Sequence, residues 1–335
     1  MPELPEVETI RRGLAACLLG ERLRSVKVLR PSVVVGSARR FAAALKGRRL
    51  QAFRRHGKLL IIDLSDGLSL LIHLRMTGQL LLPRGPELPA YTRVVFELAP
   101  GDPPPSRGAG DLARQMPFPS PPGRGAGVRG RRGAGILACD QCRSCPRLRR
   151  AADPAPATPP ASSLVYADCR ALGTLEVRPT ADVPRHETLA RMGPDALQPE
   201  ALHHLTTLLD RRRAPIKTVL LDQSAIAGIG NIYASEILHA ARIAPDRPAN
   251  TLSSEERRRL RSAIRTILSA AVNSGGTTLV DGLYCDPLGA PGVYRQHLRV
   301  YGRAGKRCLR RGCPGAVARL VQQNRSSFAC RTCQR

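Results

Sequence analysis

Apolar residues recur along the chain with two spacings, one before and one after about residue 180. Residues 5–19 carry apolar side chains on one helical face, which predicts an N-terminal helix. These side chains are Val7, Ile10, Leu14 and Leu18. From 22 to 99, short apolar or alternating runs such as SVKVL, KLLIIDL, LSLLIHL and TRVVFEL follow one another between turn residues, and 164–177 resume the pattern. Short strands with frequent turns are typical of an antiparallel β-sandwich.

From about residue 186 the spacing becomes helical. Apolar residues repeat every three or four positions in ETLARMG, PEALHHLTTLLDRR, APIKTVLLDQ, NIYASEILHAARI and SSEERRRLRSAIRTILSAAVNSG. Ser253 or Ser254 is suited to cap the last of these helices. The pattern predicts an all-helical domain over 186–275, followed by a glycine-rich loop region and a segment that bears cysteines.

Residues 100–163 interrupt the strand pattern. They contain thirteen prolines and nine glycines, about a third of the segment, together with many arginines. Such a composition cannot bury enough apolar surface to offset the entropy lost on ordering. We therefore expect a disordered insertion between two strands of the sandwich.

The charge of the chain points to a polyanionic partner. The formal net charge is +27, nearly all basic residues are arginine, and residues 294–335 hold eleven Lys or Arg and no acidic residue. A field of this sign favours nucleic acid and salt-sensitive association. A general surface bias explains part of the excess, but not that segment. Aromatic residues make up only 3% and Trp is absent, which argues against a single-strand binder that stacks bases. The composition favours duplex DNA held by its phosphates.

The N-terminus and the apolar segments indicate a cytoplasmic protein. No cationic segment followed by an apolar core stands at the start, so no secretory signal is predicted. The most apolar region, 59–74, is interrupted by Asp63 and Asp66 and is too short to span a bilayer. We expect no membrane segment.

Four cysteines near the C-terminus have the spacing C-x4-C-x16-C-x2-C, and they are Cys308, Cys313, Cys330 and Cys333. Four thiolates at this spacing predict one closed structural Zn²⁺ site. Two disulfides are the alternative, which a reducing compartment disfavours. A second group comprises Cys139, Cys142 and Cys145. A metal site there needs a fourth ligand, for which Cys169 and His56 are candidates, and the sequence does not fix one.

The opening MPELPEVETIRRGL offers a nucleophile. Removal of Met1 leaves Pro2 with a free secondary amine, and an α-amino group titrates near pH ~7.7–8. Attack of the neutral amine on a sugar C1′ gives an iminium, which makes neighbouring C–H and C–O bonds breakable. Glu3 and Glu6 lie beside it and can move protons. The structural alternative is an ordinary helix start, where proline and glutamate are both common.

Two further segments combine glycine with a polar group. Lys58 follows His56-Gly57 at the start of an apolar strand, a position where lysine is usually solvated. The segment GIGN, residues 228–231, lies between two predicted helices. Glycines permit close backbone approach and the N–H groups at a helix start bind phosphate, so Asn231 can both cap the helix and contact phosphate. The alternative is an ordinary capped helix–turn–helix.

Four segments in this order resemble the formamidopyrimidine-DNA glycosylases, the bacterial 8-oxoguanine DNA glycosylases. They are MPELPEVETIRRGL, RRHGKLLIIDL at 54–64, GIGNIYASEIL at 228–238 and the four-cysteine finger at 308–333. The resemblance implies an α+β multidomain fold. The expected parts are a catalytic β-sandwich domain with an N-terminal helix over 1–180, a helix–two-turn–helix DNA-binding domain over 186–275, a lesion-recognition loop region over 276–300 and a β-hairpin zinc finger over 301–335. The family has only a short turn where this chain has residues 100–163.

The resemblance also implies roles for single residues. It makes Pro2 the nucleophile, with Glu3 and Glu6 in proton transfer, and assigns Lys58 to the phosphate of the damaged nucleotide. Arg54 and Arg55 are expected to add phosphate charge. The residues it implies for DNA binding are Lys217, Asn231, Tyr233, Tyr301 and Arg325. Of these, Asn231 and the hairpin-tip Arg325 are expected at phosphates and Tyr233 beside the extruded base.

A flipped nucleotide leaves a gap in the duplex that side chains must fill. The family fills it with Met, Arg and Phe, which correspond here to Met76, Arg170 and Leu172. Arg75 stands where the family usually has glycine, and Ala171 where it has a second arginine. Core packing is the alternative for Met76 and Leu172. The first two cysteines of the finger are also separated by four residues instead of the usual two.

The sequence thus favours a bifunctional DNA glycosylase and AP lyase of base excision repair, acting on oxidised purines such as 8-oxoguanine and formamidopyrimidines. It would form a Schiff base through an N-terminal proline, followed by β,δ-elimination, and require one structural Zn²⁺. We expect a monomer on double-stranded DNA containing damaged bases, in the bacterial cytoplasm with the nucleoid. One alternative is a family relative that prefers oxidised pyrimidines, and another is a non-catalytic zinc-finger DNA-binding protein.

Overall fold

The computed structural model describes residues 2–99 and 163–335, which belong to one compact unit. The predictions for the insertion and for Cys139, Cys142 and Cys145 lie outside these residues. The helices are α1 (Leu4–Leu18), α2 (Ala38–Leu45), α3 (Glu187–Ala190), α4 (Pro199–Leu209), α5 (Ile216–Leu221), α6 (Asn231–Ala241) and α7 (Ser254–Asn273). The strands are β1 (Arg22–Val28), β2 (Leu50–His56), β3 (Leu59–Leu64), β4 (Leu68–His73), β5 (Gly78–Leu81), β6 (Thr92–Ala99), β7 (Ser163–Asp168), β8 (Thr174–Pro179), β9 (Val317–Gln322) and β10 (Arg325–Cys330).

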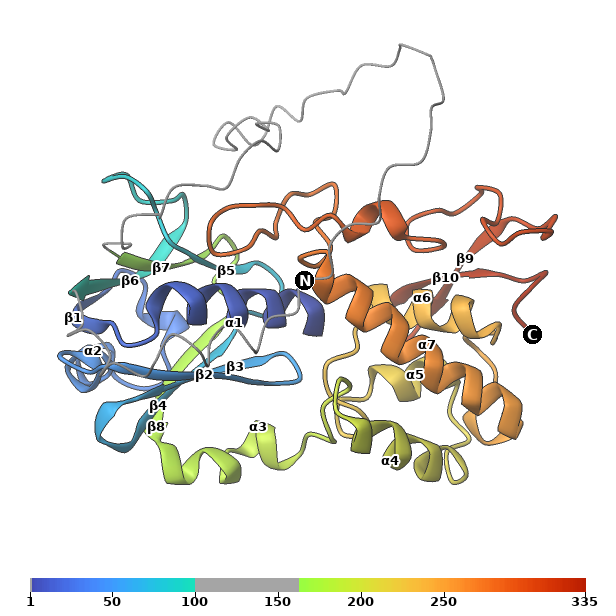
Figure 1. Cartoon of the computed structure of the whole chain (residues 1–335), viewed down its shortest axis with the longest axis horizontal. Coiled ribbons are helices and arrows are strands. Elements are labelled where there is room, and N and C mark those ends of the chain that lie inside the picture. Colours follow the sequence, from blue (N-terminus) through green and yellow to red (C-terminus); the bar gives the residue numbers. More distant parts are fainter. Residues whose placement is uncertain (1, 100–162) are drawn as a thin grey trace, which may run out of the picture. The chain divides into compact units, whose positions relative to one another are not determined.

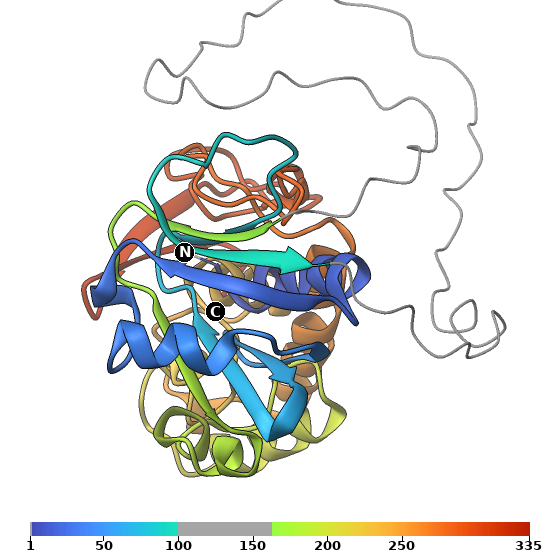
Figure 2. The ribbon, with the colours of Figure 1, turned by 90° about the vertical axis from the view of Figure 1, so that its left-hand side faces the viewer.

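The strands before residue 180 form the predicted sandwich (Figures 1 and 2). One sheet has the order β1-β6-β7-β5 and the other β2-β3-β4-β8, and all neighbours are antiparallel. Leu60, Ile62 and Ile72 of one sheet and Phe96 and Tyr166 of the other are fully buried in a common core. Because side chains alternate between the two faces of a strand, the apolar alternation of the sequence supplies this core.

Helix α1 connects two hydrophobic cores. Its apolar stripe, Val7 to Leu18, belongs to the core of the sandwich, whereas Leu4 at its start belongs to the core formed by α4 to α7. The helix contacts β2 and β3 on one side and α7 on the other. The N-terminal residues are therefore held where the sandwich meets the helices.

The helical segment has the predicted character. Of the two candidate caps for α7, Ser253 is the N-cap, accepting a bond from Glu256 N while the Glu256 carboxylate accepts one from Ser253 N (2.8 Å). Helix α6 is almost wholly buried. Its Glu236 carboxylate accepts bonds from three backbone N–H groups at 299–301, which ties the following loop to the helix. Strands β9 and β10 form the predicted C-terminal hairpin. Within the described ranges, no helix is long and apolar enough to cross a membrane.

Candidate active site

Pro2 and Glu3 immediately precede α1, and Glu3 is its N-cap residue. The backbone N–H of Glu3 donates to the Glu6 carboxylate (2.8 Å), and Val7 N donates to the Glu3 carbonyl. Pro2 is buried and precedes the helix. The proline that lies in the first turn of α1, as in an ordinary helix start, is Pro5. Glu3 and Glu6 therefore stabilise the start of α1. Their carboxylates also accept hydrogen bonds from residues far away in the sequence.

The Glu3 carboxylate lies at the N-terminus of α6. It accepts bonds from Ile232 N (2.9 Å) and Tyr233 N (3.3 Å), and the residue is 1% exposed. The positive end of a helix dipole stabilises a carboxylate in this position. Gly230 makes the approach possible, since a Cβ there would lie 2.2 Å from the Glu3 carboxyl carbon. The GIGN segment thus packs against the N-terminal residues of the chain. Two of the N–H groups that were expected to bind phosphate, those of Ile232 and Tyr233, donate to Glu3.

The Glu6 carboxylate is buried among neutral donors. It accepts bonds from Tyr233 Oη (2.5 Å) and Thr277 N (2.7 Å) in addition to Glu3 N. Burial and the nearby Glu3 charge raise the pKa of Glu6 and these hydrogen bonds lower it, with a net pKa of about 7. At neutral pH the group is present in both protonation states, which suits a residue that moves protons.

Tyr233 is fully buried, and its hydroxyl contacts Glu6 and Thr277 Oγ1 (2.8 Å). The expected place of Tyr233 beside the extruded base stays a prediction. In the structure its hydroxyl holds the Glu6 carboxylate. The sequence did not reveal this because the contact spans more than two hundred residues.

Lys58 lies in the tight turn between β2 and β3, beside the same cluster. It is 8% exposed, and burial lowers the pKa of its ammonium, an effect that Glu3 opposes and Arg325 reinforces. Asp195 holds the turn, because its carboxylate accepts a bond from Gly57 N (2.7 Å). Gly57 has a φ of +55°, and a Cβ there would lie 3.0 Å from Ala227. The turn thus packs against the loop that receives Glu3.

The two arginines before this turn have internal partners. The Arg55 side chain is largely covered and pairs with both Glu8 and Asp195, and Arg54 pairs with Asp63 (2.5 Å). The Arg55 guanidinium links α1, β2 and the segment that precedes α4. The Arg55 side chain is only 6% exposed and pairs with two carboxylates, and its expected charge at a DNA phosphate stays a prediction.

Lys217 joins the helical domain to the C-terminal hairpin. Its ammonium donates to Asn231 Oδ1 (2.7 Å), Ser327 Oγ (2.6 Å) and the Ser326 carbonyl (3.2 Å). Burial lowers its pKa to about 8. All three N–H groups are thus used within the protein, and a phosphate contact would have to replace one of these bonds.

Asn231 is the first residue of α6, and the N-cap is Gly230, so the predicted capping role of Asn231 is wrong. The Asn231 side-chain amide instead donates to the Ser326 carbonyl (3.0 Å). Arg325 is exposed and stands next to Ser326 where the hairpin begins to return, and its charge acts on Lys58 and Lys217. A cationic group of Lys58, Lys217 and Arg325 therefore forms beside the carboxylates.

Tyr301 packs against the hairpin through its ring. Its ring meets Phe328 of β10 edge-on with centroids 5.1 Å apart, and its backbone N–H donates to Glu236 (2.8 Å). Burial raises the pKa of the Tyr301 phenol, and a side-chain hydrogen bond with Asn231 opposes that rise. Tyr301 is half-buried, so its predicted DNA contact remains a prediction.

The three proposed duplex-filling side chains come from two loops. Met76 is 43% exposed in the loop between β4 and β5, and Leu172 is 50% exposed in the loop between β7 and β8. The guanidinium of Arg170 lies 3.7 Å from the Met76 sulfur. Core packing, the alternative for Met76 and Leu172, is excluded by this exposure.

His73 was not identified from the sequence. It ends β4 and pairs in the sheet with Leu59, next to Lys58. Burial, together with the charges of Arg75 and Lys58, lowers its pKa to about 4, so the imidazole is neutral. The register between two adjacent strands brings it to the site, and the HLRMTG segment alone does not show that register.

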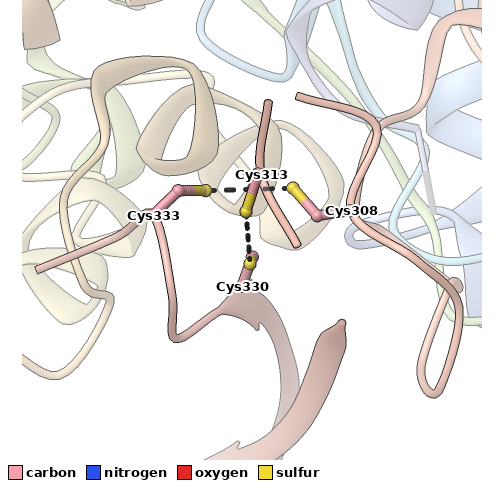
Figure 3. Close-up of side chains that lie close together, drawn as sticks. All are labelled: Cys308, Cys313, Cys330 and Cys333. Atoms are coloured by element: carbon pink, nitrogen blue, oxygen red, sulfur yellow. Dashed lines mark hydrogen bonds between the residues drawn. The ribbon is translucent and has the colours of Figure 1, made fainter. Parts of the chain in front are cut away.

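The four C-terminal cysteines come together in the hairpin segment (Figure 3). Their sulfur atoms all lie within 4.8 Å of one another, with 3.8 Å between Cys308 and Cys333 and 3.7 Å between Cys313 and Cys330. A tetrahedron with Zn–S bonds of ~2.3 Å has edges of ~3.8 Å, so the thiolates fit a tetrahedral metal ion. Gly312, with a φ of +74°, lies within the four-residue spacer and helps to turn it, so the longer spacing is compatible with the cluster.

Comparison with known proteins identifies the two larger parts of the chain. The profile of the formamidopyrimidine-DNA glycosylase N-terminal domain matches residues 1–105, and that of the H2TH domain of the same family matches residues 192–281. The formamidopyrimidine-DNA glycosylase of Methylobacterium nodulans is 36% identical over 343 positions, covering 100% of this chain and 99% of that protein. That of Cereibacter sphaeroides strain ATCC 17025 is 35% identical over 337 positions, covering 100% of both.

Solved structures that are similar to this chain carry the same family name. The crystal structure of the MutM (Fpg) protein from Thermus thermophilus has a TM-score of 0.74 and 32% identity, covering 99% of this chain and 98% of that one. The complex between Lactococcus lactis Fpg and DNA containing an abasic site has a TM-score of 0.74 and 26% identity, covering 99% of both chains.

Proposed function

The chain belongs to the formamidopyrimidine-DNA glycosylase family of base-excision repair enzymes, and we propose that Pro2 supplies the nucleophile of its reaction. The protein is a DNA glycosylase, and the AP-lyase activity that accompanies excision is characteristic of the family. We assign oxidised purines as its substrates and Pro2, Glu3, Glu6 and Lys58 as its catalytic residues. Neither alternative, the pyrimidine-directed relative or the non-catalytic binder, is favoured by these relatives.

One observation carries the proposal. The two buried carboxylates of the N-terminal segment, those of Glu3 and Glu6, lie in different environments. Glu3 accepts two N–H bonds from the start of α6, whereas Glu6 accepts a phenol and two N–H bonds in a site that raises its pKa to about 7. Two titratable groups with different environments are suited to separate acid and base roles. Glutamates that only stabilise the start of a helix do not need these additional hydrogen bonds from distant segments.

The excision step follows from this arrangement. The neutral amine of Pro2 attacks C1′ of the everted nucleotide, and the bond between C1′ and the base breaks with its electron pair on the base, which takes up a proton. Glu6 receives the proton that the Pro2 nitrogen loses. Glu3 then supports protonation of the sugar ring oxygen as the C1′–O4′ bond opens, which leaves an iminium between Pro2 and C1′.

The iminium draws electrons from the sugar and permits strand cleavage. Loss of a proton from C2′ expels the 3′ phosphate as the C3′–O bond breaks. Loss of a proton from C4′ then expels the 5′ phosphate as the C5′–O bond breaks, and hydrolysis of the iminium frees Pro2. The product is a one-nucleotide gap. The sequence of steps requires neither a redox cofactor nor a nucleotide.

We propose that the cationic group binds the DNA backbone around the lesion. In this proposal Lys58 and Arg325, whose charges act on each other, contact phosphates near the everted nucleotide, since ammonium and guanidinium groups bind phosphate oxygens strongly. Met76, Arg170 and Leu172 fill the duplex behind it. We further propose that the protein acts as a monomer on nucleoid DNA in the cytoplasm.

We also propose that the cysteine cluster holds one Zn²⁺. Cys308, Cys313, Cys330 and Cys333 offer four thiolates and leave no open coordination position, which is typical of structural zinc. The ion would hold the two ends of the hairpin together and so fix Arg325 and Ser326 against the helical domain. It takes no part in the chemistry.

Trapping with borohydride tests the nucleophile. Incubation of the protein with a duplex that contains one 8-oxoguanine and sodium borohydride is expected to give a covalent protein–DNA adduct, because the reductant converts the iminium to a stable amine. Peptide mass spectrometry should locate the adduct on Pro2. A matched protein whose N-terminus is blocked by an uncleaved tag should give none. Excision by the blocked protein, or an adduct on a lysine, would contradict the assignment.

The ionisation of Glu6 predicts a pH dependence of stability. The pKa of Glu6 is raised from 4.5 to about 7, so between these values the folded protein retains a proton that the unfolded chain has released. Stability from this group is therefore complete below pH ~4.5, declines by about 3 kcal/mol as the pH rises to ~7, and is level above it.

Urea denaturation from pH 4.5 to 8 measures this effect. The Glu6→Gln variant should lack this component of the slope, because glutamine does not titrate. The comparison uses the difference in slope between the two proteins, since the glutamine also changes the hydrogen bond with Glu3 N. Identical slopes for the two proteins would mean that Glu6 titrates at its ordinary pKa.

A further inference from the structure

The loop between β7 and β8 is organised by one buried carboxylate. This loop, residues 169–173, is called the Arg170 loop below. Asp168 is the last residue of β7 and is 1% exposed. Its carboxylate accepts bonds from the backbone N–H groups of Arg170 (3.1 Å), Leu172 (2.9 Å) and Gly173 (2.9 Å). The two proposed duplex-filling residues of this loop thus donate their own N–H groups to Asp168.

The same carboxylate reaches the second loop. The Met76 loop, residues 74–77, lies between β4 and β5, and the hydroxyl of Thr77 donates to Asp168 Oδ1. Thr77 is buried and adjacent to Met76 in the chain. One oxygen of Asp168 is therefore shared by the Met76 loop and the Arg170 loop. Above this contact, the Arg170 guanidinium meets the Met76 sulfur at 3.7 Å.

A buried tyrosine completes the junction. The Tyr166 hydroxyl donates to Asp168 Oδ2 (3.0 Å) and lies between two glycines, one from each side of the junction. A Cβ on Gly78 would lie 2.8 Å from the Tyr166 hydroxyl, and a Cβ on Gly173 would lie 1.9 Å from it. Glycine at these positions therefore lets both loops close over the hydroxyl. No side chain larger than hydrogen fits there without displacing Tyr166.

The energetics of this carboxylate depend on both loops. A buried carboxylate that loses its donors is strongly destabilised, whereas each hydrogen bond to a charged group is worth more than one between neutral groups. Burial raises the pKa of Asp168, but the hydrogen bonds from Thr77, Gly173, Tyr166 and Arg170 outweigh it and lower the pKa, so the group is ionised at neutral pH. Displacement of either loop would leave part of the charge without donors. The two loops are thus coupled through one ion.

We propose that Asp168 is a positioning residue that fixes the Met76 loop and the Arg170 loop as one rigid unit, so that their exposed side chains enter the duplex together. This inference rests on the proposed function, because it assumes that Met76, Arg170 and Leu172 fill the duplex. Asp168 itself touches no DNA, since it is buried beneath the loops. Its effect is on extrusion of the nucleotide and not on the bonds made and broken at C1′.

Other contacts keep the strand in place when the carboxylate is changed. Asp168 N donates to the Tyr91 carbonyl (3.0 Å), and the Arg93 guanidinium donates to the Asp168 carbonyl (2.8 Å). These bonds use the backbone of residue 168 and survive a side-chain substitution. The Asp168→Asn variant should therefore fold, which circular dichroism and thermal unfolding would verify.

The Asp168→Asn variant tests the proposal with two substrates. An amide nitrogen cannot accept a hydrogen bond, so either orientation of the asparagine leaves at least one backbone donor of the Arg170 loop unpaired. Single-turnover excision of 8-oxoguanine from a duplex is expected to fall ~10–100-fold, the value of one or two charge-assisted bonds. Cleavage at a preformed abasic site should change less than ~3-fold, because no stacked base has to be extruded.

A fluorescent base measures insertion directly. In a duplex with 2-aminopurine beside the lesion, stopped-flow fluorescence follows the unstacking of that base, and the Asp168→Asn variant should slow this phase by the same factor as excision. Tyr166→Phe removes one of the five donors and should give a smaller effect of the same kind. Asp66→Asn is the matched control, because Asp66 is exposed and pairs only with surface groups.

The outcomes separate the two proposals. Equal losses on both substrates with an unchanged fluorescence phase would overturn the coupling role of Asp168. Failure of the wild-type protein to cleave either substrate, with a fluorescence phase that still depends on Asp168, would overturn the proposed chemistry and leave the coupling role standing. Excision at the wild-type rate by Asp168→Asn would also overturn the coupling role.

Discussion

Replacement of Glu3 by glutamine is expected to reduce excision of 8-oxoguanine from duplex DNA by ~10²–10⁴-fold, the range in which general acid–base catalysis contributes. The carboxylate is held by Ile232 N and Tyr233 N at the start of α6. A glutamine keeps the size of the side chain but offers one accepting oxygen in place of two. Its amide also cannot take up and release a proton in the range where the sugar oxygen requires it.

The measurement is single-turnover excision followed on a denaturing gel, with the product of base loss and the product of strand cleavage counted separately. Glu200→Gln is the matched control, since Glu200 is also a glutamate near a helix start but is exposed on α4. Thermal unfolding distinguishes lost chemistry from lost structure. Excision by Glu3→Gln within ~3-fold of the wild type would remove Glu3 from the catalytic residues, because a general acid or base contributes at least ~10².

The sequence predicted the parts of the fold that depend on local pattern. The stripe of α1, the alternating strands and the helices after residue 186 all follow from residue spacing, and the structure confirms them. Local chemistry was also sufficient for the cap at Ser253 and for the four-cysteine cluster. In each case the residues that interact are close in the chain or share a spacing that only one structure satisfies.

The partners of single site residues were not predictable in the same way. Asn231 has the sequence position of a helix cap, but Glu3 approaches from the other end of the chain and Gly230 becomes the N-cap. In the sequence, Arg55 has no evident partner. In the structure it pairs with Asp195, which lies 140 residues further on. A buried charge depends on contacts between distant segments, and the spacing of residues does not encode such contacts.

The same reasoning explains why the roles of Tyr233 and Asp168 emerged only from the structure. Tyr233 was predicted to contact DNA because of its place in a motif, whereas its side chain is directed inward to Glu6. Nothing in the sequence assigned a role to Asp168, since aspartate at the end of a strand is common in turns. Its five donors come from three segments of the sandwich. The direction of the Tyr233 side chain and the convergence of five donors on Asp168 could be determined only from the structure.

Loss of the proposed Zn²⁺ from the cysteine cluster is expected to abolish duplex cleavage. The Cys330→Ala variant removes one of four thiolates, and the affinity for Zn²⁺ should fall so far that the purified protein holds less than ~10% of one equivalent, given that ligand loss breaks a closed site whose binding energy is ~10–16 kcal/mol. Such a binding energy exceeds what a hairpin of this size gains from its small apolar core. The hairpin should therefore lose its fixed position.

The consequence reaches the active site through Lys217. When the hairpin is fixed, Ser326 and Ser327 occupy two of the three donors of the Lys217 ammonium, and Arg325 stands beside Lys58. Without it, the buried ammonium keeps Asn231 but loses its other two acceptors, and the DNA loses a phosphate contact, so binding and cleavage should both fall. Metal analysis, binding to a duplex with an abasic analogue and cleavage of 8-oxoguanine duplex should change together, whereas Cys17→Ala, which alters an exposed cysteine of α1, should change none of them. Full cleavage by a Cys330→Ala protein that holds no zinc would show that the hairpin positions Arg325 without a metal ion.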